Sequence, residues 1–277
     1  MQEESKNLAK WLADKGVNGL YLTGSSGEAF FQTTDERKLI VESVVEEVGD
    51  RLTVIVHTGA ASTKDARKLS KHAKKVGAHA ISAVPNVYYT IPKACIEKHW
   101  DAMIESAELP FFTYNIPQTT GYNISMNLFK KMTEKDYVIG IKNTSVSAAQ
   151  INMFRRNSPK GFIIFNGPDD QLLAGRILGG DGGIGGTYGC MPELYVNLNR
   201  AIEEKDMNKA MLWQNKINTI MDNLRKFPST TALAAAKAVL NARGMDIGGV
   251  RLPMITIPSD DPFIIDTAFM IEAFVQI

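Results

Sequence analysis

The chain has 277 residues, of which 44% are hydrophobic and 22% are charged, an ordinary composition for a globular protein. Its 31 lysines and arginines nearly balance 30 aspartates and glutamates, so no long-range field favours binding to nucleic acid or to an acidic membrane. The first ten residues are polar and charged, and no apolar run reaches the ~18 residues that a membrane span needs. We therefore expect a cytoplasmic protein whose partners are small molecules.

Short apolar runs recur along the chain and are separated by longer amphipathic stretches. The runs do not alternate polar with apolar residues, which indicates strands buried on both faces of a parallel sheet. The strands that we expect are Gly19–Thr23, Thr53–Thr58, His79–Val84, Pro110–Asn115, Val138–Thr144, Phe162–Asn166 and Gly183–Thr187.

Helical patterns alternate with these strands. In the stretch Asp35–Val48, apolar residues recur at helical spacing after a Thr-Thr pair. Because strand and helix alternate serially, and because no Rossmann glycine fingerprint follows the first strand, the pattern favours a (β/α)8 TIM barrel over an open sheet. The other helices expected in this part of the chain are Glu4–Lys15, Lys64–Lys75, Lys93–Ser106, Ser125–Met132, Ala148–Arg155, Asp169–Leu178 and Pro192–Glu203.

A barrel of this type needs eight strands, whereas the sequence offers seven and begins with a helix. The first strand would lie upstream of Met1, so either the sequence is truncated or the barrel closes unusually.

Beyond the last strand, further helices exceed what a barrel requires. They are interpreted as an outer cap or an oligomer surface, with a direct role in catalysis as the alternative. Because no low-complexity linker occurs, we expect one domain, with the barrel over residues 1–205 and a helical extension over 206–277. The helices expected in the extension are Asp206–Lys226, Thr230–Ala242 and Pro262–Val275.

The two cysteines, Cys95 and Cys190, lie far apart and outside any CxxC pattern. Together with the four histidines they form no metal-ligand spacing. We expect two reduced thiols in the core and no bound metal.

In parallel barrels the reactive groups lie at the carboxyl ends of the strands and in the loops that follow, so these positions define the candidate site. Lys142 lies inside the apolar run that ends VIGIKNTS. If it faces the barrel interior, it loses hydration, which disfavours the ammonium form and leaves a neutral amine as nucleophile. The alternative is a lysine that reaches solvent or pairs with a carboxylate.

Tyr114 ends the preceding apolar run, in FFTYNIPQTTG, one strand from Lys142. A phenol at this place could shuttle protons during carbinolamine formation and cleavage of a carbon–carbon bond. The alternative is a half-buried tyrosine whose hydroxyl is satisfied at the rim of the barrel.

Other strand ends carry glycine-rich or polar patterns. In Gly24–Gly27, two hydroxyls and exposed N–H groups could bind a carboxylate, although a capped tight turn has the same pattern. Asp169 and Asp170 could accept hydrogen bonds from substrate hydroxyls, or they could be favourable charges at a helix N-terminus. The segment Gly182–Gly186 has four glycines in five residues, which suggests close approach of a ligand. The tyrosine pair that begins at Tyr88 is more typical of packing.

The motifs GSSGEAF, YNIPQTTG, GIKNTS and FNGPDDQLLAGRILGGDGGIGGTY occur in this order, each at a strand end. Over about residues 5–258, the chain therefore resembles the family of N-acetylneuraminate lyases and dihydrodipicolinate synthases. The resemblance implies a (β/α)8 barrel with C-terminal helices, usually in a homotetramer. It also implies a Schiff base between pyruvate and a strand lysine, formed without a cofactor. The family's first strand is the element that this chain lacks.

The resemblance also implies roles for single residues. Lys142 would form the Schiff base, Tyr114 would transfer protons, and Tyr88 would be a second tyrosine of the relay, lent across a dimer interface. The substrate-binding residues that it implies are Ser25, Ser26, Thr144, Gly167, Asp169, Asp170, Ile184 and Gly186.

Within the implied site, the carboxylate of pyruvate would lie against Ser25 and Ser26, with the backbone of Ile184 nearby. Asp169 and Asp170 would hold the hydroxyl groups of a sugar tail, with aspartate in place of the family's more usual glutamate at the second position.

The choice between family members depends on a few positions. The similar dihydrodipicolinate synthases carry an arginine where this chain has Thr119, so the chain lacks their bidentate clamp for an amino-acid carboxylate. Thr144 matches the lyase pattern. Gly186 and Pro168 depart from it, since lyases carry a serine and an aromatic residue at these places.

We therefore expect a lyase that cleaves N-acetylneuraminate, or a related 2-keto-3-deoxy sugar acid, to pyruvate and an aldehyde sugar. The alternative within the family is a dihydrodipicolinate synthase, which condenses pyruvate with aspartate semialdehyde. The alternative from another class is a catalytically inactive binding or regulatory protein with the same fold.

Overall fold

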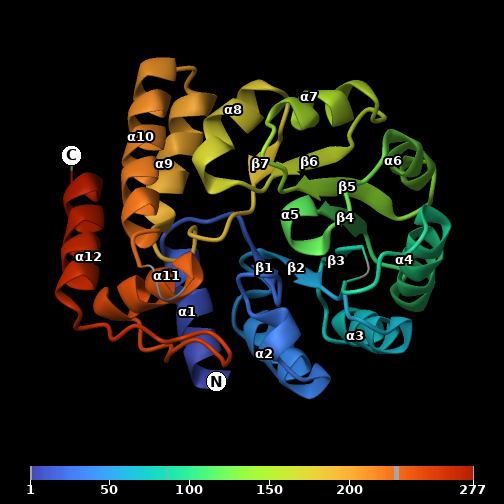
Figure 1. Cartoon of the computed structure of the whole chain (residues 1–277), viewed down its shortest axis with the longest axis horizontal. Helices are drawn as coiled ribbons and strands as arrows, with labels where there is room; N and C mark the ends of the chain where they lie inside the picture. The colour runs from blue at the N-terminus through green and yellow to red at the C-terminus, as the bar shows by residue number, and fades with distance from the viewer. Residues whose placement is uncertain (1, 86, 228–230, 277) are drawn as a thin grey trace.

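A sheet of seven parallel strands lies at the centre of the computed structural model, which describes residues 2–85, 87–227 and 231–276. The order of the strands in space is their order along the chain. Within the described residues, the first and last strands each pair on one side only, so the sheet curls without closing (Figure 1). The strands are β1 (Gly19–Leu22), β2 (Thr53–His57), β3 (Ala80–Ala83), β4 (Phe111–Asn115), β5 (Val138–Asn143), β6 (Ile163–Asn166) and β7 (Gly182–Gly183).

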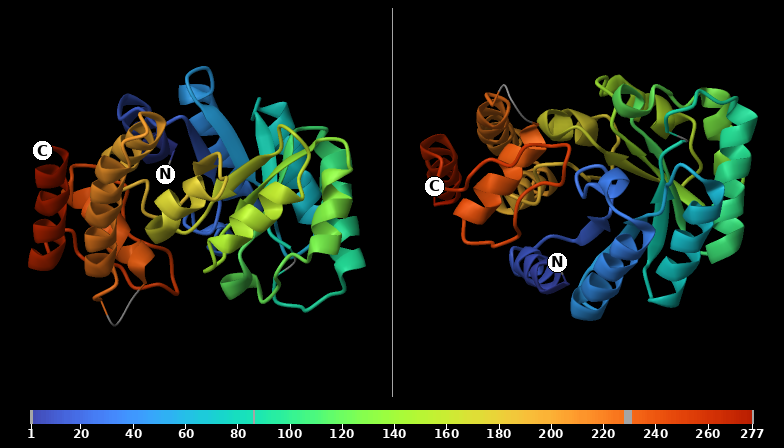
Figure 2. Two further views of the ribbon diagram at one scale, coloured as in Figure 1. Left: turned by 90° about the horizontal axis from the view of Figure 1, so that it is seen from above. Right: turned by 60° about the horizontal axis from the view of Figure 1, so that its bottom comes forward.

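Helices surround the curled sheet on its outside (Figures 1 and 2). Side chains cap the N-termini of several of these helices. At the start of α2, for example, Thr33 accepts from the N–H of Glu36, and the Glu36 carboxylate accepts from the N–H of Thr33, which is a capping box. The helices are α1 (Gln2–Asp14), α2 (Thr34–Val48), α3 (Thr63–Lys75), α4 (Lys93–Ala107), α5 (Pro117–Thr120), α6 (Met126–Thr133), α7 (Ala149–Arg156), α8 (Leu172–Ile177), α9 (Pro192–Glu203), α10 (Met207–Leu224), α11 (Ala232–Ala242) and α12 (Pro262–Val275), with 3-10 helices η1 (Ala29–Phe31) and η2 (Asp169–Gln171).

Both faces of the sheet are buried, which explains why the strand sequences do not alternate in polarity. Inside the curl, Ile55, Ala80 and Phe112 pack in one apolar cluster. On the outer face, other strand residues such as Ile81 and Ile141 pack against side chains of the surrounding helices. Residues of one parity in each strand therefore face the interior, where a site can form.

The last helices share one apolar core with the end of the barrel. Buried residues of α9, α10, α11 and α12 pack together, and Leu8 and Trp11 of α1 pack against them. Figure 1 shows these helices on one side of the sheet. The division into residues 1–205 and 206–277 stays a prediction. Within the described ranges, no helix is both long and apolar enough to span a bilayer.

Three expected elements differ from the structure. The expected strand Gly183–Thr187 is only Gly182–Gly183, because the N–H groups of Gly186 and Thr187 donate to the carboxylate of Asp169 rather than to a neighbouring strand. The expected helix Asp169–Leu178 is a 3-10 turn followed by the short α8. The expected start of a helix at Thr230 lies outside the described residues, and α11 begins at Ala232 after the cap Thr231.

The prediction of two core thiols is wrong for one cysteine. Cys190 is buried, and its Sγ donates to the carbonyl of Thr187 over 3.2 Å. Cys95 is exposed, because it lies on the outward face of the first turn of α4, away from the apolar stripe of that helix. The two thiols therefore differ in reactivity.

We expect a thiol reagent at mildly alkaline pH to label Cys95 quickly in the folded protein and Cys190 only after unfolding. Burial raises the pKa of Cys190 to about 12, so its reactive thiolate is scarce as well as covered. The measurement is the number of thiols labelled with and without denaturant. In a Cys95→Ser variant the fast phase should vanish, and a fast phase that remains would contradict the assignment.

Candidate active site

Lys142 and Tyr114 are neighbours across two paired strands at the carboxyl end of the sheet. They occupy the same register position of β5 and β4. Both are buried, with exposed fractions of 7% for Lys142 and 2% for Tyr114. The Nζ atom of Lys142 lies 4.3 Å from the ring centroid of Tyr114 and 4.4 Å from that of Tyr21. Two aromatic rings therefore cover the amine inside the barrel.

The surroundings of Lys142 do not fit the alternative of a structural surface lysine. Its side chain does not extend into solvent, and no carboxylate among the residues that the structure describes forms an ion pair with it. A buried amine without a counter-ion, beside a phenol, has the arrangement of a nucleophile with a proton-transfer partner.

The phenol of Tyr114 is tuned by its neighbours. Burial raises the pKa of Tyr114, but the charge of Lys142 and the polar groups of Thr144, Ser25 and Lys142 favour the phenolate more strongly. The net effect lowers the pKa of Tyr114 below its ordinary value. The phenol thus draws together residues from the ends of β1, β4 and β5, and its lowered pKa suits a group that exchanges protons.

We expect Tyr114 to ionise at a lower pH than an ordinary tyrosine. In a spectrophotometric titration of tyrosinate, the earliest phase should disappear in Tyr114→Phe. In Lys142→Met the charge that favours the phenolate is lost, burial dominates, and the pKa of Tyr114 should move above its ordinary value. An early phase that persists in Tyr114→Phe would show that another tyrosine is the acidic one.

The loop after β1 lies against the glycine-rich segment. A Cβ atom added at Gly186 would lie 3.0 Å from the Oγ of Ser26, so Ser26 and Gly186 approach closely. Ser25 is among the hydrogen-bonding groups that lower the pKa of Tyr114. The structure thus brings Ser25 and Ser26 to the same end of the barrel as Lys142.

Glu28 ties this loop to the C-terminal part of the chain. Its buried carboxylate accepts from Nζ of Lys237 over 2.8 Å and from the backbone N–H of Arg251 over 2.6 Å. Lys237 belongs to α11, so the loop that follows β1 is held by the helices beyond the barrel.

Gly167 follows β6 and lies directly against Thr144. A Cβ atom at Gly167 would lie 1.9 Å from Oγ1 and 2.8 Å from Cα of Thr144, so rotation of the threonine side chain could not relieve the clash. Only glycine allows this approach between the ends of β5 and β6.

We expect Gly167→Ala to lower the free energy of unfolding by about 1–3 kcal/mol through overpacking. The matched control is Gly189→Ala, where an added Cβ meets no atom within 4 Å. Urea unfolding of both variants measures the difference. Equal stability of the two variants would contradict the close approach of Gly167 to Thr144.

The two aspartates after β6 have different partners. Asp169 is buried, and its carboxylate accepts from Gly186 and Thr187 N–H groups, from the Thr187 hydroxyl at 2.7 Å and from the Tyr195 hydroxyl at 3.1 Å. Asp170 is more exposed and pairs with Arg225 over 2.9 Å. Asp169 therefore holds the glycine-rich segment in shape, and the role of both aspartates toward sugar hydroxyls stays a prediction.

Ile184 and Tyr88 occupy contrasting places. Ile184 is partly buried beside the interior cluster, and its N–H donates to the carbonyl of Asn166 over 2.9 Å. Tyr88 is 91% exposed and has a left-handed backbone, and its ring meets that of Tyr89, 5.0 Å away. Within one chain, Tyr88 is therefore not brought to Lys142, and its role across an interface stays a prediction.

Several polar residues around the site were not anticipated. Tyr21 covers Lys142 from β1 and donates to Oγ of Ser82 over 2.9 Å. His57 ends β2 and is buried against the ring of Tyr114. His57 is the last residue of β2 and Tyr21 is the last but one of β1, so both lie at the reactive edge of the sheet, and their polar groups near strand ends are the sequence signal for them.

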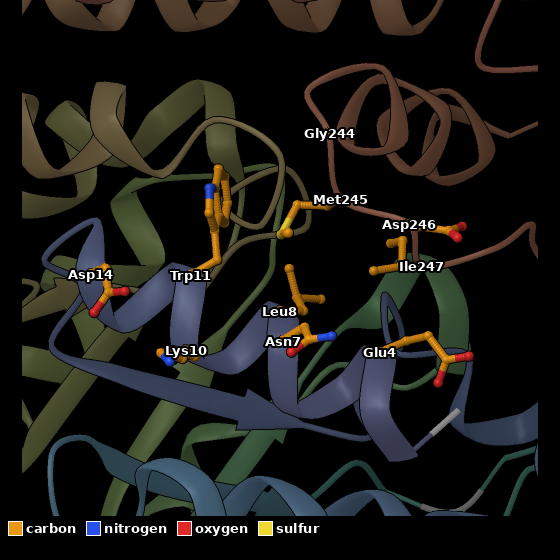
Figure 3. A pocket seen from close by; sticks show the side chains of 10 residues that line it. All are labelled: Glu4, Asn7, Leu8, Lys10, Trp11, Asp14, Gly244, Met245, Asp246 and Ile247. Carbon is orange, nitrogen blue, oxygen red and sulfur yellow. The ribbon is translucent and has the colours of Figure 1, made fainter.

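A surface pocket of about 360 Å³ lies elsewhere, between α1 and the segment Gly244–Ile247. Figure 3 shows Leu8, Met245 and Ile247 around its apolar middle. None of the residues around Lys142 lines it, so we do not assign the chemistry to this pocket. Within the described part of the chain, no group of three or more His, Cys, Asp and Glu side chains could hold a metal ion.

Comparison with known proteins adds to this geometry. Residues 1–262 match the model of the dihydrodipicolinate synthetase family. The chain belongs to this family. Among curated relatives of this family member, an N-acetylneuraminate lyase of Mediterraneibacter gnavus is 38% identical over 268 residues, which are 96% of this chain and 85% of the relative.

Solved structures of the dihydrodipicolinate synthetase family agree with the fold. The wild-type sialic acid aldolase of Ruminococcus gnavus matches 99% of this chain and 91% of its own, with a TM-score of 0.95 and 37% identity. YagE of Escherichia coli, a family member in complex with pyruvate, matches 99% of this chain and 92% of its own, with a TM-score of 0.88 and 26% identity. The expected TIM-barrel fold with C-terminal helices and the expected family are confirmed.

Proposed function

We propose that this protein is a class I aldolase that cleaves N-acetylneuraminate, or a similar 2-keto-3-deoxy sugar acid, to pyruvate and an aldehyde sugar. The observation that carries the proposal is the buried amine of Lys142 beside the phenol of Tyr114 at the reactive end of a parallel barrel. The relatives named N-acetylneuraminate lyase, at 35–38% identity, support this choice of substrate class.

The proposed reaction begins when the amine of Lys142 attacks the C2 carbonyl carbon of the keto acid. Proton transfer through Tyr114 lets the carbonyl oxygen leave as water, and an iminium between Nζ and C2 remains. Tyr114 then removes the proton of the C4 hydroxyl, the C3–C4 bond breaks, and its electron pair forms an enamine as the aldehyde departs. Protonation at C3 and hydrolysis release pyruvate and return the amine.

No cofactor is needed in this scheme, because the iminium on Lys142 accepts the electron pair of the broken bond. The hydroxyls of Ser25 and Ser26, with the backbone of Ile184, would hold the substrate's carboxylate. Asp170 would accept hydrogen bonds from sugar hydroxyls, while Asp169 would act mainly through the segment that it holds.

The substrate test is a panel followed by release of pyruvate, with N-acetylneuraminate, 2-keto-3-deoxygluconate and buffer alone. We expect the highest kcat/KM with N-acetylneuraminate. The same enzyme should not consume aspartate semialdehyde with pyruvate, because Thr119 cannot supply an arginine's bidentate clamp. Condensation with aspartate semialdehyde would favour the synthase alternative.

The inactive-homologue alternative has its own test. If pyruvate and borohydride leave the folded protein unmodified, no Schiff base forms. That result would favour a catalytically inactive binding or regulatory protein with the same fold. We further propose a cytoplasmic homotetramer in which Tyr88 reaches the site of a neighbouring subunit. A sedimentation experiment that finds only monomers in a fully active sample would overturn this role of Tyr88.

A further inference from the structure

His57, at the end of β2, forms a reciprocal pair of hydrogen bonds with Thr23. Its Nδ1 lies 3.0 Å from the carbonyl oxygen of Thr23, and the Thr23 hydroxyl donates to the carbonyl of His57 over 3.0 Å. The N–H of Val84 points to Nε2 over 3.4 Å. Because Nε2 faces a donor, the ring proton resides on Nδ1, which donates to Thr23.

Thr23 is a place where the backbone needs support. Its φ is +50°, in the left-handed region that a β-branched residue rarely adopts, and its side chain is buried. Such a conformation is strained and persists only where surrounding contacts hold it. Thr23 directly precedes Gly24, Ser25 and Ser26, so its conformation sets the direction in which the loop leaves β1.

The neutral form of His57 is strongly favoured. Burial, followed by the charges of Arg37 and Lys142, lowers the pKa of His57 well below its ordinary value, against the raising effect of its bond to Thr23. Arg37 also fixes the backbone here, because its guanidinium donates to the carbonyls of His57 and Gly59 over 2.6 and 2.9 Å. His57 is therefore neutral, with a donor at Nδ1 and an acceptor at Nε2.

His57 is unsuited to acid–base chemistry on a substrate. Both ring nitrogens have backbone partners, and the ring meets that of Tyr114 edge-on, with centroids 6.2 Å apart. We propose that His57 is a positioning residue, which holds Thr23 in its left-handed conformation and thereby aims Ser25 and Ser26 at the carboxylate of the substrate. This inference rests on the proposed function, because the effect of His57 is measured as the KM for a keto-acid substrate.

Two substitutions of His57 separate its two nitrogens. In His57→Asn the side-chain amide can occupy the place of Nδ1 and still donate to Thr23. In His57→Gln the amide reaches the place of Nε2, so the acceptor for Val84 is kept and the donor to Thr23 is lost. We expect His57→Gln to raise KM for the keto-acid substrate about tenfold or more, because one hydrogen bond that supports a strained turn is lost. The value of kcat should change less than about threefold. His57→Asn should stay within about threefold of wild type in both constants.

A second background tests the reason for the effect. Glycine adopts a left-handed φ without strain, so Thr23→Gly should remove most of the need for His57. In that background, adding His57→Gln should raise KM less than about threefold, and this failure of additivity is the signature of coupling between the two residues. Thermal melts of all variants identify those that fold.

Defined outcomes would overturn the inference. Equal KM values for His57→Asn and His57→Gln would do so, as would a fall in kcat at unchanged KM or full additivity with Thr23→Gly. Failure of the proposed function gives a different result, because pyruvate and borohydride would then leave Lys142 of the wild-type protein unmodified.

Discussion

Replacement of Lys142 by methionine is expected to reduce pyruvate release by a factor on the order of 10⁴ or more, since loss of a covalent nucleophile removes the whole pathway that depends on it. Methionine keeps an unbranched chain of similar length between the rings of Tyr21 and Tyr114, so packing in the interior is retained. It removes the nitrogen that would attack C2. Pyruvate and borohydride should add one reduced pyruvate to wild type, located at Lys142 by peptide mass spectrometry, and none to Lys142→Met.

A matched control is Lys160→Ala, which removes an exposed lysine and should leave both trapping and turnover unchanged. The free energy of unfolding of Lys142→Met should be at least that of wild type, because the substitution replaces a buried amine with an apolar side chain. A Lys142→Met enzyme that retained more than about a tenth of wild-type turnover would disprove covalent catalysis by this residue.

Replacement of Tyr114 by phenylalanine is expected to lower kcat by about 10²–10⁴-fold, the range usual for loss of a positioned general acid–base group. The ring and its contacts with Tyr21 and His57 remain, and only the phenolic oxygen is lost. Because Lys142 is intact, borohydride should still trap pyruvate, but more slowly, since dehydration of the carbinolamine has lost its proton donor.

The control is Tyr137→Phe, a change at a tyrosine that is 46% exposed and away from the interior cluster. It should turn over like wild type. If Tyr114→Phe instead raised KM and left kcat unchanged, the phenol would be a binding group, and the proton-transfer role would be wrong.

The barrel and the pair at its centre could be predicted from sequence because their signals are local. Near-continuous apolar strands alternate with amphipathic helices, and Lys142 and Tyr114 are polar residues at the ends of such strands. Parallel pairing then requires the strand ends to meet at one edge, which brings the two side chains together.

What the sequence could not predict depends on contacts between distant segments. The strand expected to reach Thr187 is shorter because the Asp169 carboxylate satisfies the N–H groups of that segment, a contact that no period in the sequence reveals. The exposure of Cys95 likewise follows from which face of α4 it occupies. The predicted role of Tyr88 also depends on a contact between distant segments, because it needs a residue of a second chain at the site.

The link between Glu28 and the C-terminal helices has a consequence for synthesis. Glu28 is separated from Lys237 by 209 positions and from Arg251 by 223. At ~5–20 residues per second, a ribosome needs roughly 10–45 s to make the intervening chain. During that interval the Glu28 carboxylate lacks both the Lys237 cation and the Arg251 N–H that bind it in the folded protein. The loop after β1 therefore reaches its final shape only when Lys237 and Arg251 have been made. A nascent chain that already contains Lys142 and Tyr114 still has an incomplete site.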